Sequence, residues 1–342
     1  MKILVTGHQG YLGTVVTPSL ASRGHKVVGL DTGWFRDCLV GPVPHDPDSQ
    51  QSDLRQVASS WLTGFDAVLN LAALSNDPMG IRWPEATMAI NGRAAVALAH
   101  AARAAGVRRF VQASTCSVYG ATPDDLVVDE SGPVEPLTTY AHAKVNVERE
   151  LATMTGEGFV AVCLRNATAF GFSPRLRLDI VVNELTAMAY LDGVVRVLSN
   201  GTPWRPYVHV ADIAHAMVAA LEAPDERLSH HLVNVGDPSL NLQVRDVATV
   251  VAEITGADLE FAERPSSDGR SYRVDFTRLR QMFPDLPPPT SLEAGVQELL
   301  DSFRRHGLLD GDRDRLRRLG WLQHLSDSGR LGAELAWPGG SA

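Results

Sequence analysis

A tyrosine and a lysine four residues apart, Tyr140 and Lys144, are the side chains in this sequence best placed to do chemistry together. Residues with this spacing share one face of a helix, so the ammonium would lie close to the phenol. A neighbouring positive charge favours the phenolate and lowers the pKa of a tyrosine from about 10 toward neutral pH. Tyr140 could then act as an acid and a base. The alternative is an exposed helix pair without function, because this spacing also arises by chance.

The first thirty-one residues predict a site for a dinucleotide. A β-branched run over 2–6 leads into Gly7-His8-Gln9-Gly10-Tyr11-Leu12-Gly13, after which a helical pattern starts. Such glycines permit a tight turn and bring a pyrophosphate against bare backbone at a helix N-terminus. A second strand over 26–30 ends on Asp31, whose carboxylate suits both ribose hydroxyls of NAD and would repel the extra phosphate of NADP. An ordinary glycine turn is the alternative, but the context of strand, helix and acid favours NAD.

The elements that must position these residues alternate between strand and helix. Apolar runs over 67–73, 109–114 and 159–164 predict strands, and residues 85–105 have strong helical composition. This alternation predicts an α/β fold with a doubly wound parallel (Rossmann) sheet, whose ligands bind at the carboxyl ends of the strands. A third strand is expected within 32–52, where the apolar signal is poor.

We expect three parts along the chain. Residues 1–165 form the NAD-binding domain, and 166–303 form a smaller α/β substrate-binding domain. Within the second part, 208–221 and 232–236 are expected to pack back onto the first. Residues 304–342 combine leucines with many arginines and aspartates, which is typical of an amphipathic helical extension that covers the body or a partner.

Composition limits the classes of function. The chain has 342 residues, of which 44% are apolar and 21% charged, as in ordinary globular proteins. Thirty-one basic and forty acidic residues give a net charge of −9, which argues against broad nucleic-acid or membrane-surface binding. Three scattered cysteines do not suggest a disulfide framework or a metal site, and strand one begins at Lys2, which leaves no room for a signal peptide. We expect a cytoplasmic protein.

Several motifs together resemble the extended short-chain dehydrogenases that act on nucleotide sugars, the NAD-dependent epimerase/dehydratase family. They are the glycine turn, Asp31, the stretch Ser114-Thr115-Cys116-Ser117-Val118-Tyr119-Gly120, the Tyr140/Lys144 pair, and the run from Trp204 to Asp212. The resemblance extends from Met1 to about Phe303. It implies that Thr115, Tyr140 and Lys144 are catalytic, that Tyr119 is structural, and that the protein is a homodimer paired through the helices at 85–105 and 140–154.

The resemblance also implies the binding residues. The cofactor contacts would be Gly7, Gly10, Tyr11, Leu12, Gly13, Asp31, Asp53, Leu54, Leu71, Ala72, Ala73, Asn91, Tyr140 and Lys144. The substrate contacts would be Ser75, Thr115, Tyr140, Asn166, Thr168, Asn183, Arg205 and Arg270. Asp53 has an equally good interpretation as a helix N-cap. Arg205 and Arg270 match two arginines that grip a nucleotide diphosphate, and two guanidinium forks suit that group, although a solvated surface charge is the alternative for each.

Departures from the family pattern reduce the number of reactions that this chain is expected to catalyse. Sugar 4,6-dehydratases carry Asp and Glu after the catalytic threonine, whereas this chain has Cys116 and Ser117, which do not readily protonate a departing hydroxyl. We read Cys116 as a buried packing residue. Thr168 replaces a common asparagine, which leaves substrate contacts in the loop at 175–179 open.

The sequence therefore favours a nucleotide-sugar 4-epimerase that acts through a keto intermediate. A keto-sugar reductase is the alternative reaction, and a non-catalytic NAD-binding regulator is the alternative class. The intact Tyr140/Lys144 pair counts against the regulator. A substrate without a diphosphate, such as a cyclitol, would have no use for both Arg205 and Arg270.

Overall fold

The central sheet grows from short apolar and β-branched runs that pair in parallel. The computed structural model describes residues 1–123, 125–156, 158–228, 231–266 and 268–337. Among these residues, seven strands pair in the order β11-β7-β5-β4-β1-β2-β3. They are β1 (Lys2–Thr6), β2 (Lys26–Asp31), β3 (Asp48–Gln51), β4 (Ala67–Asn70), β5 (Arg109–Thr115), β7 (Val160–Asn166) and β11 (Leu232–Val235). The order reverses beside β1, which confirms the predicted doubly wound parallel sheet.

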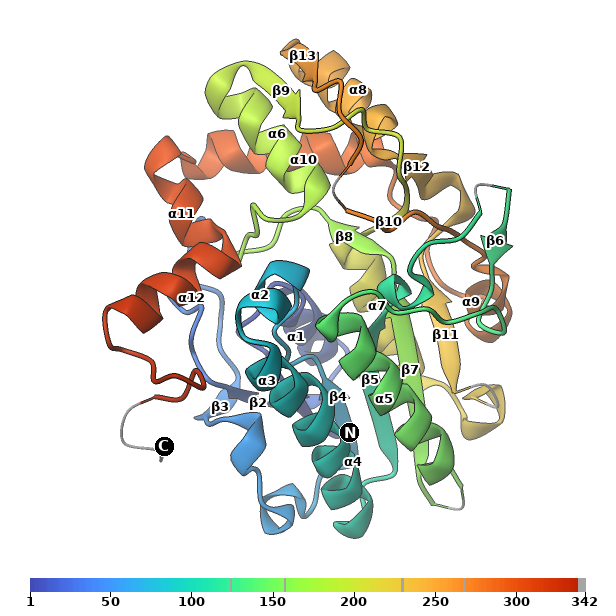
Figure 1. Cartoon of the computed structure of the whole chain (residues 1–342). Coiled ribbons are helices and arrows are strands. Elements are labelled where there is room, and N and C mark those ends of the chain that lie inside the picture. The colour runs from blue at the N-terminus through green and yellow to red at the C-terminus, as the bar shows by residue number, and fades with distance from the viewer. Residues whose placement is uncertain (124, 157, 229–230, 267, 338–342) are drawn as a thin grey trace.

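Side chains of β1 alternate between two helical layers, as the period of a strand requires. Ile3 and Val5 pack in one cluster with α1 (Gly13–Ser22) and α7 (Val210–Glu222). Leu4 packs in another with α4 (Ala95–Ala104) and α5 (Thr139–Met154). In Figure 1 α4 and α5 lie in front of the sheet, and α1 and α7 lie behind it.

The helix expected over 85–105 is three segments rather than one. It begins with α3 (Pro84–Thr87), continues as a π-helical segment (Met88–Ala94) and ends as α4. A π-helical turn adds one residue to the ring closed by each backbone hydrogen bond, and such turns are common at functional sites. Asn91 lies inside the π-helical segment and bonds the backbone of Leu74.

The second lobe packs three helices around its own core. These are α6 (Val181–Asp192), α8 (Val244–Thr255) and α10 (Leu292–His306), at the top of Figure 1. Small sheets join β12 (Asn241–Gln243), β10 (Trp204–His209) and β8 (Thr168–Phe170), then β13 (Asp258–Phe261) and β9 (Val194–Val197), then β14 (Arg273–Val274) and β6 (Val127–Val128). Shorter helices are α2 (Asp77–Arg82) and α9 (Thr277–Met282). Turns of 3₁₀ helix span Leu54–Gln56, Ser59–Leu62, Cys116–Tyr119, Asp225–Leu228, Pro238–Leu240 and Asp310–Asp312.

The two lobes exchange segments along the chain. β11 joins the large sheet beside β7, and α7 packs on that sheet, although both follow residue 165. Conversely, β6 precedes residue 165 and pairs with β14 of the second part. The cut in sequence at Arg165 is therefore not a clean cut in space.

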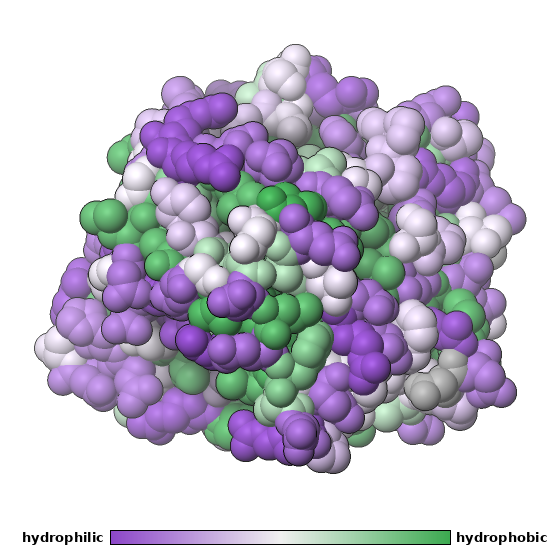
Figure 2. Space-filling view, turned by 90° about the horizontal axis from the view of Figure 1, so that it is seen from above, coloured by the Kyte–Doolittle hydropathy of each residue, from purple (hydrophilic) through white to green (hydrophobic). Residues whose placement is uncertain are grey.

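The last described residues lie against the first lobe. After α10 come α11 (Arg313–Leu316) and α12 (Arg318–Asp327), which descend toward β3 in Figure 1. Residues 338–342 of the expected extension lie outside the described residues. Figure 2 shows the molecule from above, on the side of the second lobe. On this face charged and polar side chains crowd the rim, and apolar side chains gather nearer the middle. Within the described part of the chain, no helix combines the length and apolar character needed to cross a membrane.

Candidate active site

A cavity of about 330 Å³ lies at the carboxyl ends of the parallel strands, with residues of the second lobe on its opposite wall. Parallel pairing puts these strand ends at one edge of the sheet. In the register, Thr6 lies level with Asn70, and Thr115 lies level with Asn166. Residues far apart in the chain thus reach one cavity.

The glycine turn forms the floor at one end of this cavity. Gly7 has a positive φ of 71° and donates its N–H to the carbonyl of Leu30 at 2.8 Å. A Cβ on Gly13 would lie 2.4 Å from the carbonyl oxygen of Gly7, so that a side chain there would break the turn. The turn leads directly into α1, and the first N–H groups of a helix have no partners within the helix. This end of the cavity therefore suits a phosphate.

Asp31 lies at the end of β2 beside the glycine turn. Its carboxylate accepts hydrogen bonds from the backbone N–H groups of Gln9 at 3.1 Å and Gly33 at 2.8 Å. Burial raises the pKa of Asp31, while these N–H groups and His8 act in the opposite direction. Asp31 lines the cavity, where ribose hydroxyls could donate to its carboxylate.

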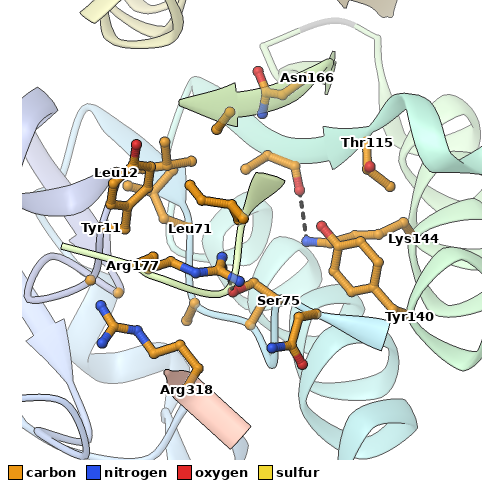
Figure 3. Close-up of a pocket in the computed structure, with 18 of the residues that line it drawn as sticks. Tyr11, Leu12, Leu71, Ser75, Thr115, Tyr140, Lys144, Asn166, Arg177 and Arg318 are labelled. Carbon is orange, nitrogen blue, oxygen red and sulfur yellow. Dashed lines mark hydrogen bonds between the residues drawn. The ribbon is translucent and has the colours of Figure 1, made fainter. Parts of the chain in front are cut away.

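The catalytic candidates converge from β5 and α5. Thr138 caps α5 by accepting a hydrogen bond from the N–H of Ala141 at 3.2 Å, which places Tyr140 and Lys144 in the first turns of the helix. The ammonium of Lys144 is fully buried, donates to the carbonyl of Ala113 at 2.7 Å and lies 5.7 Å from the centre of the Tyr140 ring. Figure 3 shows Tyr140, Lys144 and Thr115 on one side of the cavity, with the bond from Lys144 dashed.

The pKa of Tyr140 moves in the direction opposite to the one that the Tyr140/Lys144 spacing predicts. Burial raises it, and the carboxylate of Asp77 raises it further. The guanidinium of Arg177 and a hydrogen bond with Thr115 lower it, but do not outweigh burial. Burial also lowers the pKa of Lys144 to about 8. Desolvation, which a spacing pattern does not contain, decides the sign, and Arg177 is the cation that acts on the phenol.

Paired arginines line the substrate side of the cavity. Arg205 and Arg270 both contact the carboxylate of Asp268, at 3.0 Å and 2.5 Å, and Arg270 also pairs with Asp77 at 2.6 Å. Burial alone would raise the pKa of Asp268, but the hydrogen bond from Arg270 and both positive charges bring it well below its usual range. Ser117 lies at 3.4 Å from Arg270. The two guanidinium groups of Arg205 and Arg270 can exchange the carboxylates that they now contact for the oxygens of a diphosphate.

Most of the residues predicted from the sequence line this cavity. They are Gly7, Gly10, Tyr11, Leu12, Gly13, Asp31, Asp53, Leu54, Leu71, Ala72, Ala73, Ser75, Thr115, Tyr140, Lys144, Asn166, Thr168, Arg205 and Arg270. Asp53 is also an N-cap, because it accepts the N–H of Arg55 at 2.8 Å.

Asn91 and Asn183 lie behind the cavity lining. Both side chains are fully buried. Asn91 accepts from the N–H of Leu74 and donates to its carbonyl, each at 2.8 Å. Asn183 accepts from the N–H of Gly171 at 3.0 Å and donates to the carbonyl of Arg177 at 3.1 Å. Each amide therefore shapes a loop that reaches the cavity.

Further lining residues carried no signal in the sequence, or only a weak one. Arg177 and Asp179 form an ion pair at 2.9 Å in the loop whose contacts the motif left open, and Arg177 donates to Ser75 at 3.0 Å. Asp77 and Arg318 line the cavity too. Arg318 comes from the C-terminal extension, outside every recognised motif.

Comparison with known proteins matches residues 3–236 to the NAD-dependent epimerase/dehydratase family. The chain belongs to this family. A UDP-glucose 4-epimerase of Corynebacterium glutamicum is 29% identical over 315 residues, covering 87% of this chain and 94% of that protein. A UDP-glucose 4-epimerase of Streptomyces lividans is 31% identical over 271 residues, covering 75% of this chain and 81% of that protein. The solved structure of MoeE5 in complex with UDP-glucuronic acid and NAD is 28% identical with a TM-score of 0.76, covering 89% of this chain and 99% of that one.

The cavity fits the cofactor of this family. The glycine turn excludes side chains from the phosphate end, and Asp31 offers acceptors at the ribose end. Among the described residues, Nη1 of Arg318 and Oδ1 of Asn166 are buried without a hydrogen-bond partner, as expected where a polar ligand completes the site. NAD is the cofactor of the epimerase/dehydratase family, and the glycine turn and Asp31 would hold it.

Cys116 and Tyr119, which follow Thr115, are buried and hydrogen-bonded within the protein. Cys116 is buried, its thiol donates to the carbonyl of Arg165 at 3.1 Å, and burial raises its pKa. Tyr119 is buried too, donating to Asn234 at 2.8 Å and accepting from Arg165 at 3.0 Å. The Cys116 thiol therefore serves packing in this family member, as the sequence suggested.

Proposed function

We propose that this protein is an NAD-dependent 4-epimerase of UDP-hexoses. One observation carries the proposal: Tyr140, Thr115 and Lys144 meet in the NAD cavity, while the two positions after Thr115 hold no carboxylate. That arrangement supports oxidation and reduction at one sugar carbon without the acid and base that elimination of water needs. The curated relatives above are named UDP-glucose 4-epimerase, which supports the choice of substrate class.

Each residue of the site has a separate role in the proposed reaction. NAD, when bound, would supply a reversible hydride acceptor for the sugar carbon. The phenolate form of Tyr140 accepts the proton of the substrate hydroxyl and gives it back, and the hydroxyl of Thr115 donates a hydrogen bond to the same substrate oxygen. Lys144 holds the nicotinamide ribose. Arg205 and Arg270 hold the diphosphate, about which the keto-sugar turns so that the hydride can return to its other face.

The test is interconversion of UDP-glucose and UDP-galactose by the purified protein without added cofactor, followed by NMR from both directions. The same measurement with dTDP-, GDP- and CDP-sugars identifies the nucleotide base that the enzyme accepts in its substrate. We expect both directions to reach one equilibrium mixture with no net change in NAD oxidation state. Stoichiometric consumption of NADH with a reduced sugar as product would establish the keto-sugar reductase instead. Retained NAD with no turnover of any sugar would favour the regulator.

We also propose a cytoplasmic homodimer. Cys38, Cys116 and Cys163 are buried free thiols, which suits a reducing compartment. The dimer would pair α4 and α5 with their copies. On these helices Ala97 and His142 are exposed, so both positions are accessible to a second copy of the chain.

A further inference from the structure

The C-terminal segment, defined here as residues 313–337, is fastened to the loop that follows Asp31. The indole N–H of Trp321 donates to the carbonyl of Trp34 at 2.7 Å, and the indole N–H of Trp337 donates to the carbonyl of Thr32 at 2.7 Å. Arg55, beside the predicted adenine contact, donates to the carbonyl of Glu334 at 2.9 Å. The segment thus lies over the adenosine end of the cavity.

Apolar contacts reinforce these hydrogen bonds. Leucines of the C-terminal segment share a buried cluster with side chains of the first lobe around Trp34 and Met79. The segment-side members are Leu322, Leu325, Leu331 and Leu335. Removal of these four leucine side chains from water stabilises the docking of the segment. The segment is therefore a built part of the cavity wall.

Arg318 is the residue that this segment contributes to the cavity. Its side chain is 2% exposed, lines the cavity, and lies with its guanidinium 4.5 Å from the centre of the Phe35 ring. Nη2 donates to the carbonyl of Arg175 at 2.7 Å. Nη1 has no hydrogen-bond partner among the described residues, and no carboxylate among them lies within ion-pair distance of Arg318.

The positive charge of Arg318 is only partly compensated. Burial lowers its pKa to about 10, and the like charges of Arg177 and Arg175 act in the same direction, whereas Cys38 and the carboxylate of Asp179 act in the opposite one. A buried guanidinium next to two others, with an unused donor, is an unfavourable arrangement for the protein alone. An anion in the cavity would remove the penalty, because it would both accept the free N–H and balance the charge.

The position of Arg318 along the cavity indicates which anion. Phe35, under its guanidinium, belongs to the loop after Asp31 at the ribose end, whereas Arg177 acts on Tyr140 at the nicotinamide end. Both arginines act on the phenol of Tyr11 in the glycine turn. Arg318 therefore lies between the parts of the cavity that we assign to the two riboses, where a dinucleotide would have its pyrophosphate. In Figure 3 Arg318 lies below Arg177, and Tyr11 and Leu12 lie above both.

We propose that Arg318 binds the NAD pyrophosphate from the side opposite the glycine turn, so that the C-terminal segment retains the cofactor through the reaction. Backbone N–H groups at the start of α1 would bind the pyrophosphate from one side, and the guanidinium of Arg318 in α12 would bind it from the other. This inference rests on NAD binding and not on the sugar chemistry of the proposed function. A failed sugar assay and a failed binding assay therefore have separate meanings.

The test compares ligands that contain or lack the pyrophosphate. We would measure binding of NAD, ADP-ribose, adenosine and UDP to full-length protein by calorimetry, and the release rate of NAD from the protein as purified. Arg318→Met keeps the stem over Phe35 and removes the charge. Arg317→Met is the matched control, because Arg317 pairs with Glu184 at 3.0 Å and does not line the cavity.

We expect Arg318→Met to lower the affinity for NAD and for ADP-ribose by about 10- to 100-fold, as for loss of a hydrogen bond to a charged group. The variant should also release NAD faster. Its affinities for adenosine and UDP should equal those of the wild type. Arg317→Met should bind all four like the wild type. Wild-type affinity of Arg318→Met for NAD would overturn the proposal, as would equal weakening of NAD and adenosine or weakening of UDP alone. Should Arg318→Met not fold, Arg318→Lys, which keeps the charge, must still bind NAD more tightly relative to adenosine than Arg318→Gln does.

Discussion

At the scale of single residues, Tyr140 carries the proposed reaction. Tyr140→Phe removes one hydroxyl and should leave the fold and NAD binding intact, yet slow epimerisation by about 10²–10⁴. Turnover with the substrate identified above, together with NAD affinity, measures this. Tyr190→Phe, in α6 away from the cavity, is the matched control and should retain the wild-type rate. A Tyr140→Phe variant with near wild-type turnover would refute the assigned mechanism.

The pH dependence of the reaction reports the surroundings of the same phenol. Because burial raises the pKa of Tyr140, the phenol is protonated at neutral pH and the rate of sugar oxidation should rise toward alkaline pH. Arg177 lowers that pKa, so Arg177→Gln should displace the limb of kcat/KM against pH to higher pH, whereas Arg177→Lys should displace it less. A limb that stays in place in Arg177→Gln would exclude Arg177 from control of the phenol.

At the scale of elements, the N-cap of α5 sets the position of the catalytic pair. Thr138→Ala should lower the free energy of unfolding by about 1 kcal/mol and also lower kcat, because Tyr140 lies in the first turn. Ser291→Ala is the matched control, since Ser291 caps α10 through the N–H of Ala294 at 3.2 Å. It should cost similar stability and no activity. Denaturant unfolding and turnover separate the effects, and equal activity loss in both variants would contradict the argument.

Strands position the site as firmly as the helices do. Register brings Thr115 beside Asn166, and the switch point beside β1 opens the cavity between the glycine turn and β4. These strands could be read from the sequence because each is a local run of buried residues. The weakly apolar β3 was expected only within a long loop, since it is an edge strand that pairs with β2 and buries little.

At the scale of the whole molecule, we predict a homodimer of twice 36.9 kDa by light scattering at micromolar concentration. Ala97→Arg on the exposed face of α4 should yield the monomer, because a long charged side chain would separate helices that pack through alanine. Glu253→Arg, on the exposed face of α8, should leave the dimer intact. A monomeric wild-type protein would refute the assembly.

The sequence by itself determined the features that depend on neighbouring residues. The glycine spacing before α1, Asp31 at a strand end, and the i, i+4 relation of Tyr140 and Lys144 are local, because turn geometry and helix period act over a few residues. Together with the alternation of strands and helices and the resemblance to the family, they predicted the fold class, the cofactor and most of the cavity lining.

Only the tertiary structure decided what depends on distant segments. It placed Arg318 of the C-terminal segment against the cofactor cavity and Asp268 between Arg205 and Arg270. It also reversed the expected direction of the pKa of Tyr140. Desolvation and charge pairing arise from everything that packs around a group, whatever its distance along the chain, so no local pattern contains them.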